Sequence, residues 1–545
     1  QFRQRDYSGA IASYNKAIGA GASDEVIYNN RGKAKLLGKD LDGALSDFNE
    51  ALQIKPDYAV ALRNRGSVNY ELGNYETVIT DLNDAVADGN GSKEEYLYLG
   101  VSKFKTGDQS GALKDLEKAR TLGAGGGLLY YGLGNSQYAS GDFENAATSL
   151  EKVLGTEYAD GETYKNLGNA RYKLENYGGA LDALKQAVSV GVDDAETYHN
   201  LSHAYYEAKD FEEAISMANK AIAKDGGYAS AYYHRGNAKF RVKNYESAIS
   251  DYDQAVGNGY NTALVYNNRG KAKQLLEKYD EAIGDFDEAI KIDNTYAKAY
   301  QNRGETYYKK EDFEGAVESL AQFRKITDEE NPEIIYYLGE AYYGLEDYVR
   351  ALSYYDRAIE LGNKSPELLE HRAKALIENE DYGAAIKDIE QLIRSGTKSS
   401  SLYMSRAVAY TYIGNNRAAM ADLDKAIEID GTNPNAYYNR AYIKEVAEDF
   451  EGAMSEYNRV VQLRPDDDRA YYDLANTKMA VGDFGGGLGP INKAIELKPD
   501  NPSYYKMKGN IQYRMNQPGG ACKSWQKALE LGDKKSQYNL DQYCK

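Results

Sequence analysis

Three of the four histidines of this chain, His199, His203 and His234, have a spacing that could bring their side chains together. A separation of four residues places His199 and His203 one turn apart on the same face of a helix, and His234 is expected on a neighbouring helix. Imidazole nitrogens are common zinc ligands, so the three side chains could bind one divalent metal ion. Two alternatives stay open: three solvated polar groups, or an acid-sensitive contact with an anionic partner, because histidine gains charge just below neutral pH.

Two cysteines, Cys522 and Cys544, could do covalent chemistry, and both lie at the end of the chain. A disulfide between them would hold a helix over residues 534–543 as a cap on the preceding segment. In the chain-entropy model such a bond stabilises by about 3 kcal/mol. The alternative is a pair of free thiols in a cytosolic protein.

No sequence motif predicts catalysis. Nucleophile-elbow, P-loop and dinucleotide motifs need a strand–turn–helix setting, and the glycines Gly123, Gly125, Gly126 and Gly127 have no strand before them. The many carboxylates are typical of solvated helix faces. We therefore expect a protein that is not an enzyme, with no catalytic residue and no cofactor.

The composition narrows the class of partner. The 545 residues carry a net charge of -18, with a pI near 5.0. This charge argues against nucleic acid, because phosphate binding needs clustered Lys and Arg, and it favours neutral or basic protein partners. No stretch reaches the roughly 18 apolar residues that a membrane span needs, so no transmembrane segment is predicted.

The elements that position these residues form a repeat. A small residue recurs every 34 positions, with a single step of 35, and a period of this length is typical of a solenoid. In the unit from Ala263 to Asp293, apolar residues at helical spacing predict one amphipathic helix around Gly270 and a second around Phe286. The small residues are Gly32, Gly66, Gly100, Gly134, Gly168, Ser202, Gly236, Gly270, Gly304, Gly339, Ala373, Ala407, Ala441, Ala475 and Gly509.

The order of residues within this unit resembles the tetratricopeptide repeat (TPR), with tyrosine where that family often has tryptophan. The residues that carry the resemblance are Tyr266, Gly270, Tyr279, Ala282, Phe286 and Ala289. The resemblance covers essentially the whole chain. It implies an all-α, right-handed α-solenoid of about fifteen helix–turn–helix units, whose first helices line a concave groove.

We expect three parts: a partial first repeat over 1–24, a continuous array over 25–531 and a capping helix over 532–545. Ala10 and Ala17 match second-helix positions, so the chain enters partway through a repeat. This start is compatible with upstream sequence that is missing here, or with removal of a signal peptide close to this point.

An arginine often precedes the small residue, and an acidic residue usually follows that arginine sixteen positions later. Repeats without the arginine mostly lack the acid. This covariation within one sequence predicts an ion pair between the two helices of such repeats. A pair of this kind specifies geometry more than it adds stability. The arginines are Arg31, Arg65, Arg235, Arg269, Arg303, Arg372, Arg406 and Arg440.

The TPR resemblance implies that the fourth residue after the small residue lines the groove, and this position is mostly aromatic. Such a ladder would suit an extended or helical peptide partner; the alternative is that tyrosine is simply common there in this family. Gln274 interrupts the ladder, which ends before Ile377. Its rings are Tyr70, Phe104, Tyr138, Tyr172, Tyr206, Phe240, Tyr308 and Tyr343.

Two groove segments differ in charge. Lys165, Asn169 and Asn200 resemble the first part of the carboxylate clamp of chaperone-binding TPR proteins, but Ser230 and His234 stand where its further Lys and Arg belong. A later segment is acidic and would favour a partner that carries Lys or Arg. We expect its groove residues to be Glu305, Tyr308, Tyr336, Glu340 and Tyr343, with further carboxylates at Glu333, Glu367, Glu370 and Glu378.

These observations favour a non-enzymatic scaffold that binds partner proteins or peptide segments in the groove, within a larger complex. One alternative is an accessory subunit of a bacterial envelope secretion or motility assembly. Another is a peptide-binding co-chaperone with an incomplete carboxylate clamp. The closing segment from Gly520 to Lys545 resembles that of exported TPR proteins of Gram-negative envelopes, which implies the periplasm or cell envelope rather than the cytoplasm.

Overall fold

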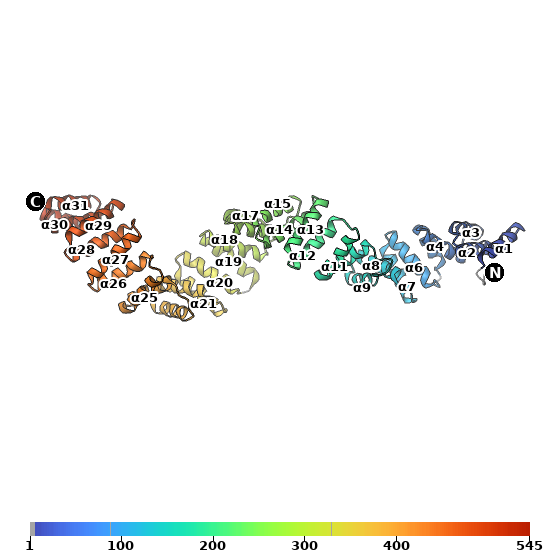
Figure 1. The fold of residues 1–545 in the computed structure, drawn as a ribbon, viewed down its shortest axis with the longest axis horizontal. Helices are drawn as coiled ribbons and strands as arrows, with labels where there is room; N and C mark the ends of the chain where they lie inside the picture. The colour runs from blue at the N-terminus through green and yellow to red at the C-terminus, as the bar shows by residue number, and fades with distance from the viewer. Residues whose placement is uncertain (1–5, 88, 329, 545) are drawn as a thin grey trace. The chain divides into compact units, whose positions relative to one another are not determined.

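The computed structural model describes residues 6–87, 89–328 and 330–544, and every regular element in these ranges is an α-helix. The chain divides into two compact units, Gln1–Asp293 and Asn294–Lys545. Within each unit, consecutive helices pack against each other as pairs, and each pair packs on the next (Figure 1). The predicted solenoid of helical hairpins is therefore confirmed for each unit.

The first element described in the first unit is a single helix, α1 (Tyr7–Gly19), and its assignment to a partial repeat stays a prediction. Eight pairs follow it: α2 (Glu25–Leu37) and α3 (Leu41–Ile54), α4 (Ala59–Glu71) and α5 (Tyr75–Ala85), α6 (Lys93–Lys105) and α7 (Gln109–Thr121), α8 (Gly127–Ala139) and α9 (Phe143–Glu151), α10 (Gly161–Lys173) and α11 (Tyr177–Ser189), α12 (Ala195–Glu207) and α13 (Phe211–Lys224), α14 (Ala229–Arg241) and α15 (Tyr245–Gly257), α16 (Ala263–Leu275) and α17 (Tyr279–Ile292).

The second unit contains seven pairs and a closing helix. The pairs are α18 (Ala297–Lys309) and α19 (Phe313–Thr327), α20 (Pro332–Gly344) and α21 (Tyr348–Glu360), α22 (Pro366–Glu378) and α23 (Tyr382–Arg394), α24 (Ser400–Tyr412) and α25 (Asn416–Ile429), α26 (Pro434–Val446) and α27 (Phe450–Leu463), α28 (Asp468–Ala480) and α29 (Phe484–Leu497), α30 (Pro502–Arg514) and α31 (Pro518–Glu530). The closing helix is α32 (Ser536–Tyr543). Fifteen complete pairs agree with the number of repeats predicted.

The turn inside each pair is set by local chemistry, as α12 and α13 show. Lys209 has a left-handed backbone with φ of 63° and ends the first helix. Asp210 then caps the second helix, and its carboxylate accepts the backbone N–H of Glu213. This cap satisfies a backbone donor that has no partner inside the helix. A short turn of this kind returns the chain antiparallel to itself.

The small residues allow the two helices of a pair to approach closely. A Cβ atom added to Gly168 would lie 2.5 Å from Cγ of Leu184, sixteen residues further on, and 3.1 Å from the backbone nitrogen of Leu184. Where the series has Ser202, the residue sixteen positions on is Ala218. A larger residue on the first helix is therefore matched by a smaller one on the second, as close packing requires.

One repeat offers two glycines for which the same substitution should have opposite effects. Gly284 is exposed inside α17 and nothing would contact an added Cβ atom, whereas a Cβ atom on Gly270 would lie 2.7 Å from the Phe286 ring. We expect Gly284→Ala to stabilise the fold by about 1 kcal/mol, because alanine is the better helix former. Gly270→Ala should destabilise it by about 1–3 kcal/mol through overpacking. Hydrogen exchange of α16 and α17 measures both; a stabilising Gly270→Ala would contradict the packing argument.

The predicted ion pairs between the two helices are confirmed. The arginine and the acidic residue lie 2.5–2.9 Å apart in Arg31–Asp47, Arg65–Asp81, Arg235–Asp251, Arg269–Asp285, Arg372–Asp388, Arg406–Asp422 and Arg440–Glu456. In the remaining repeat that has this arginine, Arg303 Nε donates to the hydroxyl of Ser319 at 3.0 Å. These arginines therefore belong to the architecture of the repeats.

The structure adds a second cation that the sequence analysis missed. A lysine four positions after the arginine contacts the same carboxylate at 2.6–2.9 Å in four repeats, as Lys35, Lys239, Lys273 and Lys444 do. Asp115, whose repeat has no such arginine, is held by the equivalent Lys103 at 2.6 Å. In these five repeats the same carboxylate therefore has a lysine as a counter-ion, with or without the arginine.

The predicted disulfide and cap are also present. Cys522 of α31 is bonded to Cys544, with their Cα atoms 5.7 Å apart. The helix α32 is shorter than the 534–543 expected, and its Tyr543 ring lies 4.5 Å from Tyr513 and 5.9 Å from Trp525. This segment therefore packs the Tyr543 ring on the aromatic residues of the last repeat. Among the described residues, no helix is both long and apolar enough to cross a membrane.

Candidate functional site

Side chains of successive first helices meet in a recurring pair. The residue directly after the small residue of one repeat lies beside the residue two before the small residue of the next, 31 positions further on. Asparagines form this inter-repeat pair three times in the first unit. The amide nitrogens of Asn166, Asn200 and Asn268 donate to Asn135 at 2.9 Å, Asn169 at 2.9 Å and Asn237 at 3.1 Å, respectively. These bonds link neighbouring repeats along one face.

The residues that resemble a carboxylate clamp take part in these internal bonds. Asn169 and Asn200 are brought together as one inter-repeat pair, and Asn169 also donates to the Tyr138 hydroxyl at 3.2 Å. Lys165 Nζ lies 3.2 Å from Asp194 and 3.0 Å from Glu196. A partner carboxylate would have to displace both of these acids from Lys165. The geometry therefore does not favour the clamp.

The histidines form the next inter-repeat pair along the first unit. His203 and His234 occupy the positions of Asn169 and Asn200, with ring centroids 4.4 Å apart, and His199 lies 4.9 Å from His234. Burial lowers the pKa of all three: that of His199 to about 4, and that of His234 well below its usual range. The other two imidazoles also lower the pKa of His234, because protonation would place like charges close together. The cluster is therefore neutral at pH 7.

The nitrogen atoms of this cluster do not converge on one point. His203 Nδ1 is hydrogen bonded to the Tyr172 hydroxyl at 2.7 Å, and His199 Nδ1 lies 3.2 Å from Asn200 Oδ1. Within the described ranges, no group of three or more His, Cys, Asp or Glu side chains is arranged to hold a metal ion. The structure thus brings the three histidines together but does not support the metal site predicted for His199, His203 and His234.

Glu340, predicted to present its carboxylate to a basic partner, is instead buried in the second unit. It forms an inter-repeat pair with His371, whose Nδ1 lies 2.6 Å from Glu340 Oε1. The hydroxyls of Tyr355 and Tyr308 donate to the two carboxylate oxygens at 2.7 and 2.8 Å. Burial opposes ionisation, but these hydrogen bonds prevail and lower the pKa of Glu340. Its charge is used within the fold, which corrects the prediction for this residue.

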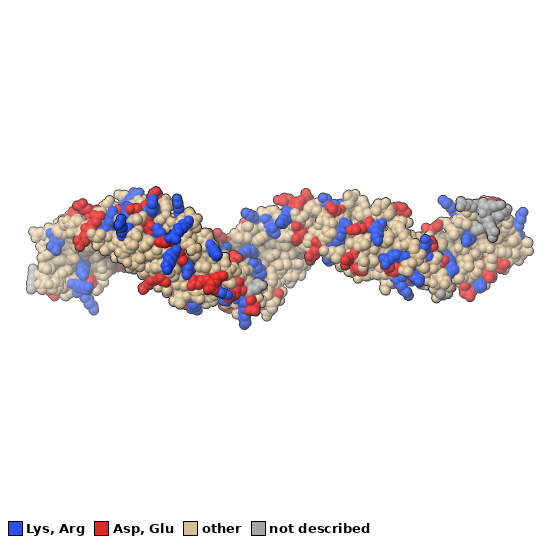
Figure 2. Space-filling model, turned by 90° about the horizontal axis from the view of Figure 1, so that it is seen from below, with Lys and Arg blue, Asp and Glu red and all other residues tan. Residues whose placement is uncertain are grey.

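Two further residues of the acidic segment also have internal partners. Glu305 accepts a hydrogen bond from the Gln301 amide at 2.8 Å, and the Tyr336 hydroxyl lies 3.1 Å from His371 Nδ1. By contrast, Glu367 and Glu378 are exposed at the ends of α22. Acidic and basic side chains are interspersed on the face shown in Figure 2. Exposed carboxylates of this segment are therefore Glu333 of α20 and Glu367 and Glu378 of α22, whereas Glu340 is buried.

Most rings of the aromatic ladder pack against another aromatic ring of the same repeat. Seven of the eight rings pack against the aromatic residue that begins the second helix, with centroids 5.3–6.2 Å apart, and all eight stay half-buried. Phe104 lacks such a neighbour and packs on Tyr131 at 5.8 Å. The packed pairs are Tyr70–Tyr75, Tyr138–Phe143, Tyr172–Tyr177, Tyr206–Phe211, Phe240–Tyr245, Tyr308–Phe313 and Tyr343–Tyr348. A role of the ladder in peptide binding stays a prediction.

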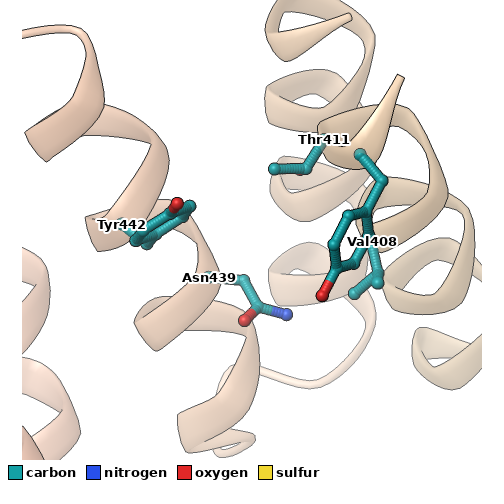
Figure 3. A pocket seen from close by; sticks show the side chains of 5 residues that line it. Val408, Thr411, Asn439 and Tyr442 are labelled. Carbon is teal, nitrogen blue, oxygen red and sulfur yellow. The ribbon is translucent and has the colours of Figure 1, made fainter. Parts of the chain in front are cut away.

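A pocket that the sequence analysis missed lies between α24 and α26. It has a volume of about 350 Å³ and is lined by Val408, Thr411, Tyr412, Asn439 and Tyr442. Asn439 and Tyr442 of α26 face Val408 and Thr411 of α24 across it (Figure 3). Thr411 stands at the ladder position, and the second helix of this repeat begins with Asn416 rather than an aromatic residue. The absence of aromatic residues at both positions is the sequence feature that indicates the pocket.

The helical hairpins, the recurring small residues and the inter-repeat pairs define an α-solenoid repeat protein. The tetratricopeptide repeat model matches residues 1–59, 131–197, 165–229, 199–259, 302–366 and 372–434. Two further models of this repeat match 275–311 and 434–467. The chain belongs to the tetratricopeptide repeat family.

Several solved structures are similar over part or all of the chain. The C-terminal part of a TPR repeat-containing protein from Cytophaga hutchinsonii is 23% identical over 44% of this chain and 97% of its own, with a TM-score of 0.37. YrrB, described as a TPR protein with an unusual peptide-binding site, is 21% identical over 35% of this chain and 98% of its own, with a TM-score of 0.33. A chain of the Naa15/Naa10 complex bound to HypK-THB is 13% identical over 99% of this chain and 95% of its own, with a TM-score of 0.38. A comparison with curated proteins gave no match.

Proposed function

We propose that this protein is an interaction scaffold that binds extended segments of partner proteins along the face formed by its first helices. Half-buried rings and polar side chains alternate along this face, so it offers both apolar contacts and hydrogen bonds to a peptide. The observation that carries the proposal is the pocket between α24 and α26, an open site on that face with no charged residue in its lining. A solenoid suits this role, because its repeats form an extended surface.

The charge of the chain favours basic partner segments. The net charge is -18, and exposed carboxylates such as Glu367 and Glu378 lie at the ends of a first helix. Electrostatic attraction of this kind speeds association and weakens with salt. We therefore expect the affinity of a partner segment to fall as the salt concentration rises.

Selection from a displayed library of random 12-residue peptides on the full chain tests the proposal. Peptides rich in Lys and Arg should be enriched, and their binding should slow hydrogen exchange in first helices such as α24 and α26. Tyr538→Ala, which removes an exposed ring from α32, is the control and should leave binding unchanged. Protection confined to second helices, or no peptide enriched above the unselected library, would contradict the proposed function.

We further propose that the protein acts in an oxidising compartment, such as the periplasm or cell envelope. The disulfide between Cys522 and Cys544 supports this location, because structural disulfides persist in oxidising environments. Thiol alkylation of the protein from its native source tests the location. Labelling of either cysteine before reduction would argue for a reducing compartment.

A further inference from the structure

The pocket between α24 and α26 lies where an inter-repeat pair is missing. Asn439 holds the position of Asn200 and Asn268, each of which donates to an asparagine of the preceding repeat. The corresponding residue before Asn439 is Val408, which has no hydrogen-bonding group. In the part of the chain that the structure describes, the side-chain amide of Asn439 has no partner. It points instead toward the pocket (Figure 3).

The same place lacks the pair of rings that packs together in seven other repeats. Thr411 and Asn416 replace the packed aromatic pair formed by, for example, Tyr172 and Tyr177. Space for a ring is thereby left beside Thr411, with a volume of about 350 Å³. Tyr412 and Tyr442 border this space with side chains that are 67% and 51% exposed. Exposed rings around an unfilled pocket are typical of a binding site rather than of a core.

One wall of the pocket continues into a group of carboxylates. Tyr412 stacks on Tyr382 of the preceding repeat, with centroids 4.7 Å apart and planes 2° from parallel. Glu378, Glu380 and Asp381 come just before Tyr382, and all three are exposed. A cation next to the ring that enters the pocket would lie near these carboxylates. The charges thus complement a Lys or Arg beside an aromatic residue.

We propose that the pocket formed by Val408, Thr411, Tyr412, Asn439 and Tyr442 binds an aromatic side chain of an extended partner peptide, with a Lys or Arg adjacent to it. The ring fills the space left by Thr411 and contacts Tyr412 and Tyr442. The Asn439 amide bonds to the peptide backbone, since it offers both a donor and an acceptor. This inference rests on the proposed function and specifies the ligand of one site on the first-helix face.

The test uses the fluorescein-labelled peptide Gly-Ser-Lys-Phe-Lys-Ser-Gly and fluorescence anisotropy with the full chain. The Phe peptide should bind at least ten times more tightly than the same peptide with Ala in place of Phe, because a buried aromatic anchor dominates such contacts. Thr411→Tyr places a ring in the pocket, as in most other repeats, and should weaken binding at least tenfold. Val408→Asn restores a partner for Asn439 and should weaken it several-fold.

Both variants carry residues that this chain already has at the same positions in other repeats, Tyr172 and Asn169. Thermal unfolding followed by circular dichroism checks that they fold. Tyr538→Ala, which removes an exposed ring from α32, is the control and should leave binding of the Phe peptide unchanged. Equal binding by wild type and Thr411→Tyr, or no binding of the Phe peptide, would overturn the assignment of this pocket. The library selection would still succeed in that case if the scaffold binds peptides elsewhere, so the two failures are distinguishable.

Discussion

Replacing Asp251 by alanine is expected to lower the free energy of unfolding of the repeats around α15 by about 3 kcal/mol. The Asp251 side chain is 3% exposed and accepts hydrogen bonds from Arg235 at 2.6 and 2.9 Å. Lys239 Nζ lies 2.7 Å from the same carboxylate. Removal of the acid leaves two neighbouring cations, both largely buried, without their shared counter-ion. The free energy lost by burying those unpaired cations exceeds the net stabilisation that the ion pair itself provides.

Asp253, two residues further along the same helix, is the control for this prediction. Its side chain is 53% exposed and pairs with Arg269 of the next repeat at 2.6 Å. Asp253→Ala should cost less than about 1 kcal/mol, because water already solvates Asp253 and Arg269 keeps Asp285 as its counter-ion. Native-state hydrogen exchange of α14 and α15 is the suitable measurement, since solenoid repeats unfold locally. Equal losses in the two variants would refute the distinction between buried and exposed pairs.

The ion pairs were predictable because both partners lie within one repeat. The sixteen-residue spacing recurs in phase, so Arg31 and Asp47 could be compared directly with Arg235 and Asp251. The lysine that shares the carboxylate is also visible in the sequence, at Lys35 and Lys239. Repetition thus allows one sequence to reveal contacts that normally need an alignment of relatives.

The inter-repeat pairs were harder to predict because they join different positions of two successive repeats. His203 and His234 stood out as rare residues, yet their equivalence to Asn169 and Asn200 appears only when the two positions are compared 31 residues apart. For Glu340, the residue type indicated an exposed charge. Its burial depends on three hydrogen-bond donors, from Tyr308, Tyr355 and His371, that come from three other helices. Side-chain identity alone does not fix such a network.

The pocket between α24 and α26 escaped prediction for a different reason. Sequence motifs indicate reactive or binding side chains that are present. This site arises instead because Thr411 and Asn416 stand where other repeats have aromatic rings. The end of the aromatic ladder before Ile377 is visible in the sequence, but it does not by itself indicate that a pocket is present. A missing side chain in a packed repeat leaves space, and that space becomes a candidate site when exposed rings border it.

The histidine cluster is expected to make the first unit less stable as the pH falls from 7 to 4.5. Burial lowers the pKa of His199 to about 4, and also lowers those of His203 and His234, whereas unfolded histidines titrate near 6.5. Below pH 6.5 the unfolded chain therefore binds more protons than the folded one. Stability is full above this pH and is lost as the pH falls toward the folded pKa values. For His199 alone, which is 8% exposed, the full loss is about 3 kcal/mol, because one pKa unit corresponds to about 1.4 kcal/mol.

Charged neighbours modify this response without reversing it. Glu207 lies 3.5 Å from His203 Nε2 and favours its protonated form, and Glu196 acts in the same direction on His199. Lys173 opposes protonation of His199. Burial is nevertheless the largest effect on each of the three imidazoles. The net result is a cluster that resists protonation until the surrounding repeats loosen.

A triple variant with asparagine at all three positions isolates the effect of the cluster. His203→Asn and His234→Asn recreate the inter-repeat pair of Asn169 and Asn200, and His199→Asn introduces the residue found at the equivalent Asn267. Hydrogen exchange of α12 and α14 at pH 7 and pH 4.5 should show a large loss of protection in the wild type and a much smaller one in the variant. Carboxylates that titrate in this range affect both proteins alike, so the difference between them reports the histidines. Parallel losses in the two proteins would mean that the imidazoles are already accessible to protons in the folded chain.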